Sequence, residues 1–592
     1  MPIRRFILRT PWVDIVLVLG LAGLLWGLYG VGQEWFGNLH EKVAIDLSPA
    51  SLPGYTLLSL TRGMLAYVLS LGFTLVYAFW AAKHRPSGLI LVPLLDILQS
   101  IPVLGFMPGL VVGLIVVFPQ RNVGLELAAV VMIFTGQAWN MTFSFYRSLT
   151  SLPTDQQEAA RAFRFSWWQR LRWVELPAAT TGLVWNSMMS MAGGWFFLML
   201  SETFVLGERD YRLPGLGSYM QAALTQGDWL AMSWGIGAMV LMIVLLDQLL
   251  WRPLVVWSER FRVEDSAAAV AQESWFLDVL HGSRLVRWIT QASGQKKPSL
   301  MSSAPVGSDA VAEWGARLAW LAFALLVGVL IYGAWLLMGL LVQVPLVQVP
   351  LVQDPLVQVP LVQVPSEMTA VGSASDASWS GIVWGTCLTA MRVVGSLVLG
   401  TLWALPAGLA IGRSPTWSRR LQPVVQVAAS FPAPMLFPLF LMLFHLVGLP
   451  LGTGAMILML LGTQWYILFN VIAGAQAIPS DLREATSAFR MSSWQRFKTL
   501  EAPAVLPALV LGWVTAAGGA WNASIVAEYL SWKGTIYAVD GLGAIISKAA
   551  TAADYPALAA SVTCMAITVV LINVICWRPL RNVAHDRYSL NK

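Results

Sequence analysis

The sequence predicts an all-α polytopic membrane protein made of two six-helix repeats that run parallel to one another. The chain of 592 residues is 57% hydrophobic and only 11% charged, whereas soluble domains carry about 25% charged residues. Its apolar residues come in runs of roughly 20, the length that a helix needs to cross a hydrocarbon core about 30 Å thick. The chain also repeats its own pattern, so that Trp139 and Trp465 occupy equivalent positions 326 residues apart. These observations together indicate about twelve membrane-spanning helices.

We expect six spans in each half. Those of the first half cover residues 12–31, 57–82, 88–117, 124–146, 178–205 and 230–251. Those of the second half cover residues 317–340, 383–411, 423–447, 451–474, 505–530 and 557–577. An even number of spans in each half gives a parallel duplication, in which the halves are related by an axis along the membrane normal.

The chain divides into three segments. Residues 1–264 form the predicted first half, with a polar loop at 147–177, and residues 317–592 form the second half, with a polar loop at 475–504. A polar linker at 265–316 joins them and is rich in Gly, Ser, Lys and Pro. The first apolar run is expected to remain as the first span, because no small-residue cleavage site follows it closely.

A pentapeptide, LVQVP, repeats through residues 341–365, with one copy reading LVQDP. Proline at every fifth position excludes a continuous helix and a central strand. We expect the array to be an extended periplasmic spacer, or a repeat expansion without a function of its own.

Basic residues predict the orientation of the chain. If the N-terminus is cytoplasmic, 29 of the 37 Lys and Arg residues fall in segments on the cytoplasmic side. Cytoplasmic loops of membrane proteins carry such an excess. We therefore expect both termini and both polar loops to be cytoplasmic. The formal net charge of +6 reports this orientation and does not indicate a nucleic-acid partner.

Several kinds of site have no support in the sequence. The three cysteines lie in apolar runs without metal-ligand spacing, and the five histidines form no cluster, so we expect no metal site. No nucleophile–base set is apparent, which argues against an enzyme. The sequence has no G-x-x-x-x-G-K-[ST] motif, so we expect no nucleotide and no other cofactor to be bound by this chain.

The two polar loops repeat one another. Glu158 to Pro177 reads EAARAFRFSWWQRLRWVELP, and Glu484 to Pro503 reads EATSAFRMSSWQRFKTLEAP. Before the first copy, Thr154 and Gln157 have the spacing of a capping box, so each loop is expected to begin with a short helix. A second amphipathic stretch follows, and Pro177 or Pro503 marks the start of the next span. A short polar helix of this kind suits docking into a groove of another protein.

This pattern resembles the cytoplasmic signature of the permease subunits of bacterial ABC importers. That signature is Glu-Ala-Ala, three residues, Gly, nine residues, an apolar residue, any residue and Leu-Pro. The first loop matches at Glu158-Ala159-Ala160 and at Val174 to Pro177, and the second matches at Glu484-Ala485 and at Leu500 to Pro503, with Ala502 in place of Leu. Both halves depart at the Gly position, where Arg164 and Arg490 stand. Without Gly, we expect a continuous helix or a strained corner there.

The resemblance implies a type I ABC importer permease fold in a bacterial inner membrane, surrounded by lipid. It implies two ABC ATPase subunits on the cytoplasmic side, which would hold ATP and Mg²⁺ and hydrolyse the nucleotide, and a periplasmic substrate-binding protein. The loop helices would sit in clefts of the ATPases. The residues to which this coupling role is assigned are Glu158, Ala159, Ala160, Arg161, Arg164, Pro177, Glu484, Ala485, Arg490 and Pro503.

A second motif follows each loop. It runs Ser201-Glu202, Gly215-Leu216-Gly217 and Asp228 in the first half, and Ala527-Glu528, Gly541-Leu542-Gly543 and Asp554 in the second. This tail resembles that of the permeases for nitrate, sulfonate, taurine and bicarbonate. With the duplication, it implies a fused permease for a small anion.

Charged residues in spans are costly, so each is a functional candidate. Arg62 and Arg392 lie near the outer starts of two spans, where they would draw an anion or snorkel to the interface. Glu202 and Glu528, near outer span ends, would line the mouth or pair with a base.

Two prolines break predicted spans. Pro102 and Pro432 follow Ser100-Ile101 and Ser430-Phe431. Broken helices expose backbone groups that can line a path or hinge a gate, although a simple kink is an equal alternative. The competing class of function is a twelve-helix secondary transporter coupled to an ion gradient, for which the paired loops would have no explanation.

Overall fold

The structure is a computed structural model in which residues 12–37, 43–100, 102–206, 209–261, 274–277, 328, 331–345, 378–532 and 535–588 are described. The predicted linker, apart from residues 274–277, lies outside the described residues. So do residues 346–365 of the pentapeptide array and most of the predicted span at 317–340. The predicted division into two halves and a linker stays a prediction.

The first half is helical except for one hairpin. Its main elements are α2 (Trp12–Phe36), α3 (Leu52–Lys83), α4 (Arg85–Ser100), α5 (Val103–Val117), α6 (Val123–Thr150), α7 (Thr154–Ala162), α8 (Trp167–Arg170), η2 (Leu171–Glu175), α9 (Leu176–Ser201), β1 (Thr203–Leu206), β2 (Arg209–Arg212), α10 (Leu216–Gln226), α11 (Trp229–Leu246), η3 (Asp247–Trp251) and α12 (Arg252–Ser258).

The second half repeats this order. Its elements are α16 (Trp379–Arg413), α17 (Pro415–Ser430), η6 (Ala433–Leu436), α18 (Phe437–Val447), α19 (Leu451–Gln476), α20 (Ser480–Ala488), α21 (Ser493–Arg496), η7 (Phe497–Glu501), α22 (Ala502–Ala527), β3 (Tyr529–Trp532), β4 (Thr535–Ala538), α23 (Leu542–Thr551), α24 (Tyr555–Ile572), η8 (Asn573–Trp577) and α25 (Arg578–Tyr588). The π-helical segments η2 and η3 recur as η7 and η8, so the duplication extends to local irregularities.

Eight helices of the described part are long and apolar enough to cross a membrane, or nine if the bent pair α17–α18 counts as one span. The other predicted spans correspond to α2, to the broken pair α4–α5, and to a short apolar helix at Ile331–Leu341. An all-α polytopic protein with two repeats is therefore confirmed.

The breaks predicted at Pro102 and Pro432, within the spans 88–117 and 423–447, are confirmed. The helix α4 ends at Ser100 and Pro102 precedes α5, while α17 ends at Ser430 and Pro432 precedes η6, with a bend of 81° between the helical axes. A proline cannot donate the backbone hydrogen bond that a continuing helix needs, and it disfavours helical backbone at the preceding residue.

Two other predicted spans, 178–205 and 505–530, end earlier than expected. Glu202 and Glu528 are the C-caps of α9 and α22, and the chain then forms two-stranded antiparallel hairpins, β1–β2 and β3–β4. Asp228 and Asp554 begin α11 and α24 as N-caps whose carboxylates accept backbone N–H groups of the first turn, as short acidic caps do.

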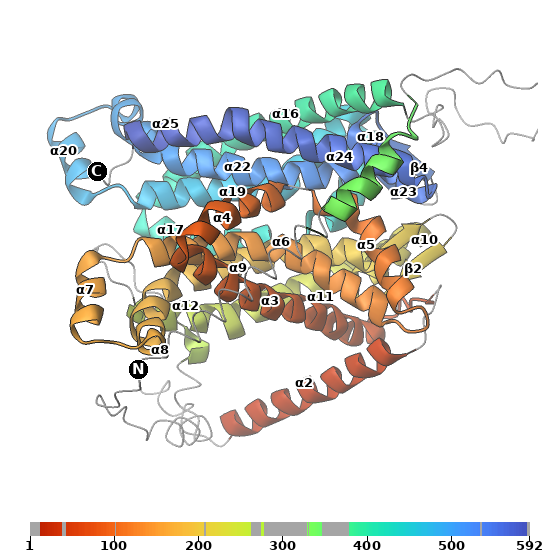
Figure 1. The fold of residues 1–592 in the computed structure, drawn as a ribbon, viewed down its shortest axis with the longest axis horizontal. Coiled ribbons are helices and arrows are strands. Elements are labelled where there is room, and N and C mark those ends of the chain that lie inside the picture. Colours follow the sequence, from red (N-terminus) through yellow and green to blue (C-terminus); the bar gives the residue numbers. More distant parts are fainter. Residues whose placement is uncertain are drawn as a thin grey trace, which may run out of the picture.

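The helices form a bundle with two distinct ends. In Figure 1 the short helices α7 and α20 lie at one end of the long axis, and the hairpins with α10 and α23 lie at the other. Within each half, α6 packs between α3 and α9, and α19 packs between α16 and α22. We call these the loop end and the hairpin end.

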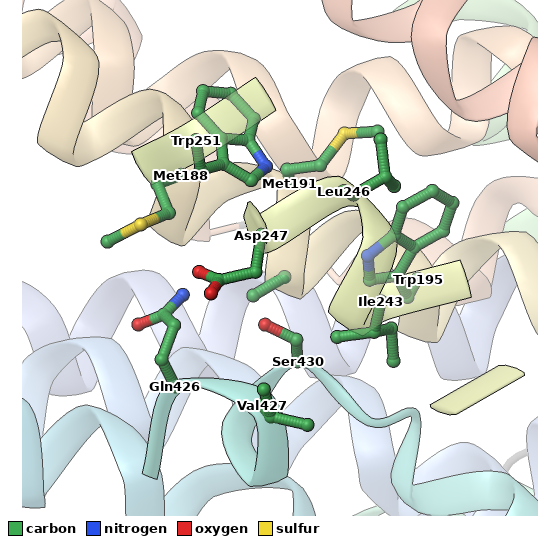
Figure 2. Close-up of a pocket in the computed structure, with 11 residues that line it drawn as sticks. Met188, Met191, Trp195, Ile243, Leu246, Asp247, Trp251, Gln426, Val427 and Ser430 are labelled. Atoms are coloured by element: carbon green, nitrogen blue, oxygen red, sulfur yellow. The ribbon is translucent and has the colours of Figure 1, made fainter. Parts of the chain in front are cut away.

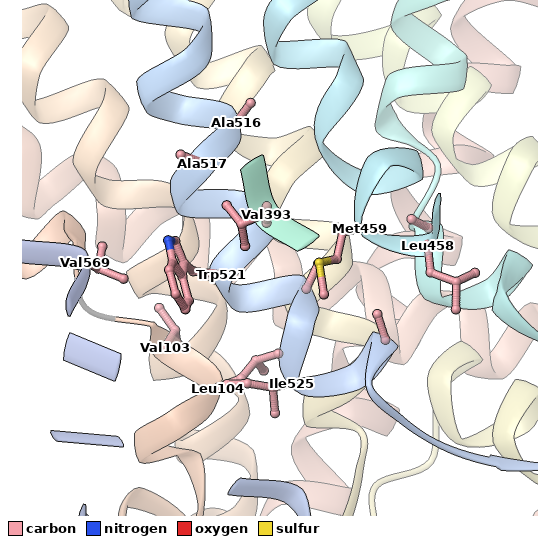
Figure 3. Packing of buried hydrophobic residues seen from close by; sticks show 14 of the residues in the cluster. Val103, Leu104, Val393, Leu458, Met459, Ala516, Ala517, Trp521, Ile525 and Val569 are labelled. Atoms are coloured by element: carbon pink, nitrogen blue, oxygen red, sulfur yellow. The ribbon is translucent and has the colours of Figure 1, made fainter. Parts of the chain in front are cut away.

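The broken helices join the two halves. Figure 3 shows Val103 and Leu104 of α5 against Trp521 and Ile525 of α22 and Val569 of α24, within the larger buried cluster. In the reciprocal contact, α17 packs on α9 and α11. The broken pair α4–α5 thus packs on α22 and α24 of the other half, while α17 and η6 pack on α9, which makes the halves a single packed unit.

Candidate functional site

The short helices α7 and α20 present the predicted coupling residues at the loop end. Glu158 and Ala159 are exposed, and Ala160 is buried. In the second copy Glu484 is exposed, and Thr486 takes the buried position of Ala160. The outward face of each helix is therefore acidic and open, while one small side chain fixes its inner face.

Each short helix ends in a tight corner at the arginine that stands at the Gly position of the signature. The Arg164 N–H donates to the carbonyl of Arg161 at 2.9 Å and the Phe165 N–H to that of Ala160 at 3.0 Å, which is the Schellman pattern. Arg164 has φ 51° and Arg490 has φ 47°, in the left-handed region that favours Gly. The expected strained corner is confirmed, and the alternative of a continuous helix is wrong.

The capping box lies in the second short helix of each loop and not in the first. Pro153 is the N-cap of α7, and no side-chain cap is formed by Thr154. Instead, Ser166 and Gln169 exchange side-chain and backbone hydrogen bonds at α8, and Ser492 and Gln495 do the same at α21. The predicted cap at Thr154 is wrong because the turn at Pro153 places that residue already inside the helix.

A buried carboxylate anchors each loop to the bundle. Glu175 is 2% exposed and pairs with Lys83 of α3 and with Arg170 of α8, the latter at 2.8 Å. Glu501 repeats this arrangement with Arg413 of α16 and with Arg496. These pairs tie the segment between the short helices and the next long helix to α3 and α16. Pro177 and Pro503 follow directly, in the first turns of α9 and α22.

Sequence reasoning missed Glu175 and Glu501. Both occupy the position that the signature leaves free, between an apolar residue and Leu-Pro or Ala-Pro. The recurrence of Glu at the same place in both copies is the signal that could have found them.

At the hairpin end, Arg62 is fully buried between two carboxylates. Its Nη1 donates to Glu202 at 2.8 Å, while Nε and Nη2 donate to the two oxygens of Glu126 at 2.6 and 2.7 Å. The side chain is 0% exposed, so Arg62 neither lines an open mouth nor snorkels to the interface. Pairing of Glu202 with a base, one of the two expected alternatives, is confirmed.

In the second half, Arg392 pairs with Glu528 at 2.7 Å. The Thr389 hydroxyl and the Gly543 N–H also donate to Glu528, as Ser59 and Gly217 donate to Glu202 in the first half. The arginine, the glutamate and the G-L-G turn of the second motif therefore form one hydrogen-bonded unit in each half.

A hollow that opens to solvent lies between the halves, and its space together with the solvent at its opening amounts to about 740 Å³. It is lined from the first half by α9, including Gly193, and from the second half by α17, η6, α19 and α22, including Gly519. Pro432 lines it, and Pro102, which is buried, is absent from its wall. Its polar lining residues are Gln426, Thr463, Trp465, Tyr466 and Asn522. The described lining residues include no Asp, Glu, Lys or Arg, so the hollow offers neutral hydrogen-bond donors without a repelling carboxylate.

A narrow hollow lies nearby, where α9, α11 and η3 meet α17. Figure 2 shows the Asp247 carboxylate pointing toward Gln426 and Ser430 of the other half. Asp247 also accepts a hydrogen bond from Arg252 Nε at 3.0 Å. Polar groups of both halves thus meet at this contact.

Comparison with known proteins assigns the family. The profile of the binding-protein-dependent transport system inner membrane component family matches residues 74–250 and 396–577, which together are more than half of the chain. The chain belongs to this family. Each half of the permease carries one copy of the domain, and each match contains one of the polar loops and one of the hairpins.

Individual relatives match over shorter stretches. The nitrate import permease protein of Synechococcus elongatus is 27% identical over 149 residues, covering 25% of this chain and 52% of the relative. The bicarbonate transport system permease protein of Synechocystis sp. is 30% identical over 149 residues, covering 25% and 51%. A putative aliphatic sulfonates transport permease protein of Bacillus subtilis is 24% identical over 201 residues, covering 33% and 70%. The permease thus spans about half the length of the first two relatives.

Proposed function

We propose that this permease is the membrane subunit of an ATP-driven importer for a small anion. The observation that carries the proposal is the pair of short acidic helices, α7 and α20, at one end of a duplicated bundle. Each helix exposes a glutamate, Glu158 or Glu484, and is followed by a buried glutamate that pairs with a long helix. An ATPase that moved α7 or α20 would therefore pull directly on α3 or α16.

In this proposal the loop end is cytoplasmic and both termini lie on that side, in a bacterial inner membrane. One ATPase subunit docks on α7 and another on α20, since each half presents one loop. ATP and Mg²⁺ belong to those subunits. A periplasmic binding protein delivers the anion to the hairpin end. The hollow between the halves supports this route, because its hydroxyl, amide and indole groups can donate to an anion and its described lining carries no acid.

The anion class is supported by the relatives named for nitrate, bicarbonate and sulfonate transport. These substrates share an oxyanion group. The competing proposal, an ion-coupled secondary transporter, leaves the exposed acidic faces of α7 and α20 without a partner.

Co-purification tests the proposal. The chain is expressed with candidate ATPase subunits, and wild type is compared with the double variant Glu158→Arg/Glu484→Arg. We expect a stable complex with wild type and its loss in the double variant, because both docking faces reverse their charge. Arg121→Glu, an exposed charge reversal in the turn before α6, is the matched control at the other end of the bundle and should keep the complex.

The contrary outcome is equally specific. The importer proposal is wrong if no ATPase binds wild type while liposomes that contain this chain alone take up an anion when an ion gradient is imposed. The chain would then be a secondary transporter.

A further inference from the structure

The first half contains a built-in example of how its arginine binds a planar oxyanion. Arg62 directs Nη1 to Glu202 and to the carbonyl of Pro214, both at 2.8 Å. Its other edge, Nε with Nη2, holds the Glu126 carboxylate in a two-point contact at 2.6 and 2.7 Å. Such paired contacts are the strongest and most geometrically selective that a guanidinium makes.

The second half keeps the cradle and lacks this carboxylate. Arg392 donates from Nη1 to Glu528 at 2.7 Å, Thr389 replaces Ser59, and the Leu542 N–H donates to Thr389 as the Leu216 N–H donates to Ser59. The position equivalent to Glu126, 326 residues later, is Gly452. Among the described residues, none accepts a hydrogen bond from Nε or Nη2 of Arg392.

The open edge of Arg392 faces the place where the missing side chain would start. A Cβ atom built on Gly452 would lie 3.7 Å from Nη2 and 4.0 Å from Nε of Arg392. The Arg392 side chain is 15% exposed, whereas Arg62 is 0% exposed. A Cβ atom on Gly452 would meet only Arg392 within 4 Å, and the Arg392 guanidinium is partly exposed where that of Arg62 is enclosed.

A second feature favours negative charge at the same point. Gly452 lies in the first turn of α19, a helix of 26 residues whose N-cap is Pro450 and which has no side-chain cap. Backbone N–H groups of a first helical turn lack partners within the helix and attract anions. In the equivalent turn of α6, Glu126 supplies the negative charge from the chain itself.

We propose that the Nε/Nη2 edge of Arg392 and the first turn of α19 form a binding site for a planar oxyanion such as nitrate, bicarbonate or a carboxylate. The first half shows that one guanidinium between two carboxylate-like groups is a stable arrangement, and a bound oxyanion gives the second half the same composition. The site lies at the hairpin end, away from α7 and α20. The role of this site in receiving the imported anion rests on the proposed function. Binding of an anion at the site requires no ATPase.

The test measures anion-dependent thermal unfolding of the purified full chain without ATPase subunits. Sodium nitrate and sodium formate are compared with sodium fluoride and sodium chloride at equal ionic strength. We expect nitrate and formate to raise the melting temperature of wild type, and fluoride and chloride, which are not oxyanions, to have a smaller effect. Equal shifts from all four salts would mean general screening and would overturn the site.

Variants at Gly452 locate the effect. Gly452→Glu should rebuild the first-half arrangement and weaken the apparent nitrate affinity at least tenfold. Gly452→Ala is its matched control, because it also improves helix propensity, and its Cβ makes only an ordinary contact with Arg392. It should respond to nitrate as wild type does, and a Gly452→Glu variant with the wild-type response would overturn the proposal.

The reciprocal variant, Glu126→Gly, opens the same edge on Arg62. It should be less stable than wild type in chloride and should regain part of its stability in formate or nitrate. Absence of that rescue, together with an unchanged nitrate response in Gly452→Glu, would show that neither arginine binds a free oxyanion. The ATPase co-purification result does not affect either readout, so the two proposals fail separately.

Discussion

Arg164 and Arg490 stand in the left-handed backbone region at the end of α7 and α20. A residue with a Cβ pays about 1–2 kcal/mol there, and Gly removes that strain while losing more chain entropy on folding. We predict that Arg164→Gly/Arg490→Gly leaves the melting temperature unchanged or slightly raised and preserves ATPase binding. Arg164→Val/Arg490→Val should lower stability by about 1 kcal/mol or more per corner, because β-branched side chains fit this backbone worst.

Differential scanning fluorimetry and the co-purification assay check both variants. Loss of the ATPase complex in the Gly variant, with its melting temperature unchanged, would show that the arginine side chains themselves contact the partner. In that case the strained backbone at Arg164 and Arg490 would be retained because the charged side chains bind the ATPase.

At the scale of elements, the buried pairs at Glu175 and Glu501 connect each loop with a long helix. Lys83 and Arg170 are 30% and 31% exposed, but Glu175 is 2% exposed, so the carboxylate carries most of the desolvation. Glu175→Gln/Glu501→Gln should cost about 1–3 kcal/mol of stability per site, as expected for an altered buried hydrogen-bonding group. ATPase subunits should still bind, because α7 and α20 are untouched, but ATP-driven uptake should fall.

Parallel measurements of ATPase co-purification and anion uptake in proteoliposomes separate these effects. Asp586→Asn is the matched control, since it removes a carboxylate that is 78% exposed on α25. If uptake in the double variant equals that of the control, the glutamate pairs serve stability alone and motion reaches the long helices by another route.

The sequence could predict much of the element order, because the duplication let each motif be checked against its copy. The breaks at Pro102 and Pro432 followed from the backbone chemistry of proline. The four-residue strands of the hairpins were too short for a recognisable alternation. The Arg62–Glu126 contact could not be predicted from the sequence either. Glu126 has no counterpart in the second half, and the two residues, 64 positions apart, meet only because α3 packs on α6.

At the scale of the whole molecule, the two contacts between the halves are equivalent in position and differ in where the acid stands. Asp96 of α4 pairs with Arg578 of α25 across the halves at 3.3 Å. In the other contact, the position equivalent to Asp96, 330 residues later in the chain, is Gln426. The acid there is Asp247, at the position that Asn573 occupies in the second half. There the ion pair, Asp247 with Arg252, stays within one half at 3.0 Å.

This exchange predicts a compensating pair of substitutions. Gln426→Asp alone puts a second carboxylate into the hollow that Asp247 faces and should lower stability, because like charges at one site raise each other's energy. Adding Asp247→Asn should restore the stability. The contact would then hold one carboxylate, one arginine and one asparagine, as the equivalent contact of Asp96, Arg578 and Asn573 does. A double-mutant cycle of thermal or denaturant unfolding should give a coupling free energy of about 1–3 kcal/mol, within the range for neighbouring residues. Additive effects of the two substitutions would mean that these side chains do not interact across the halves, and that the halves are held together there by apolar packing alone.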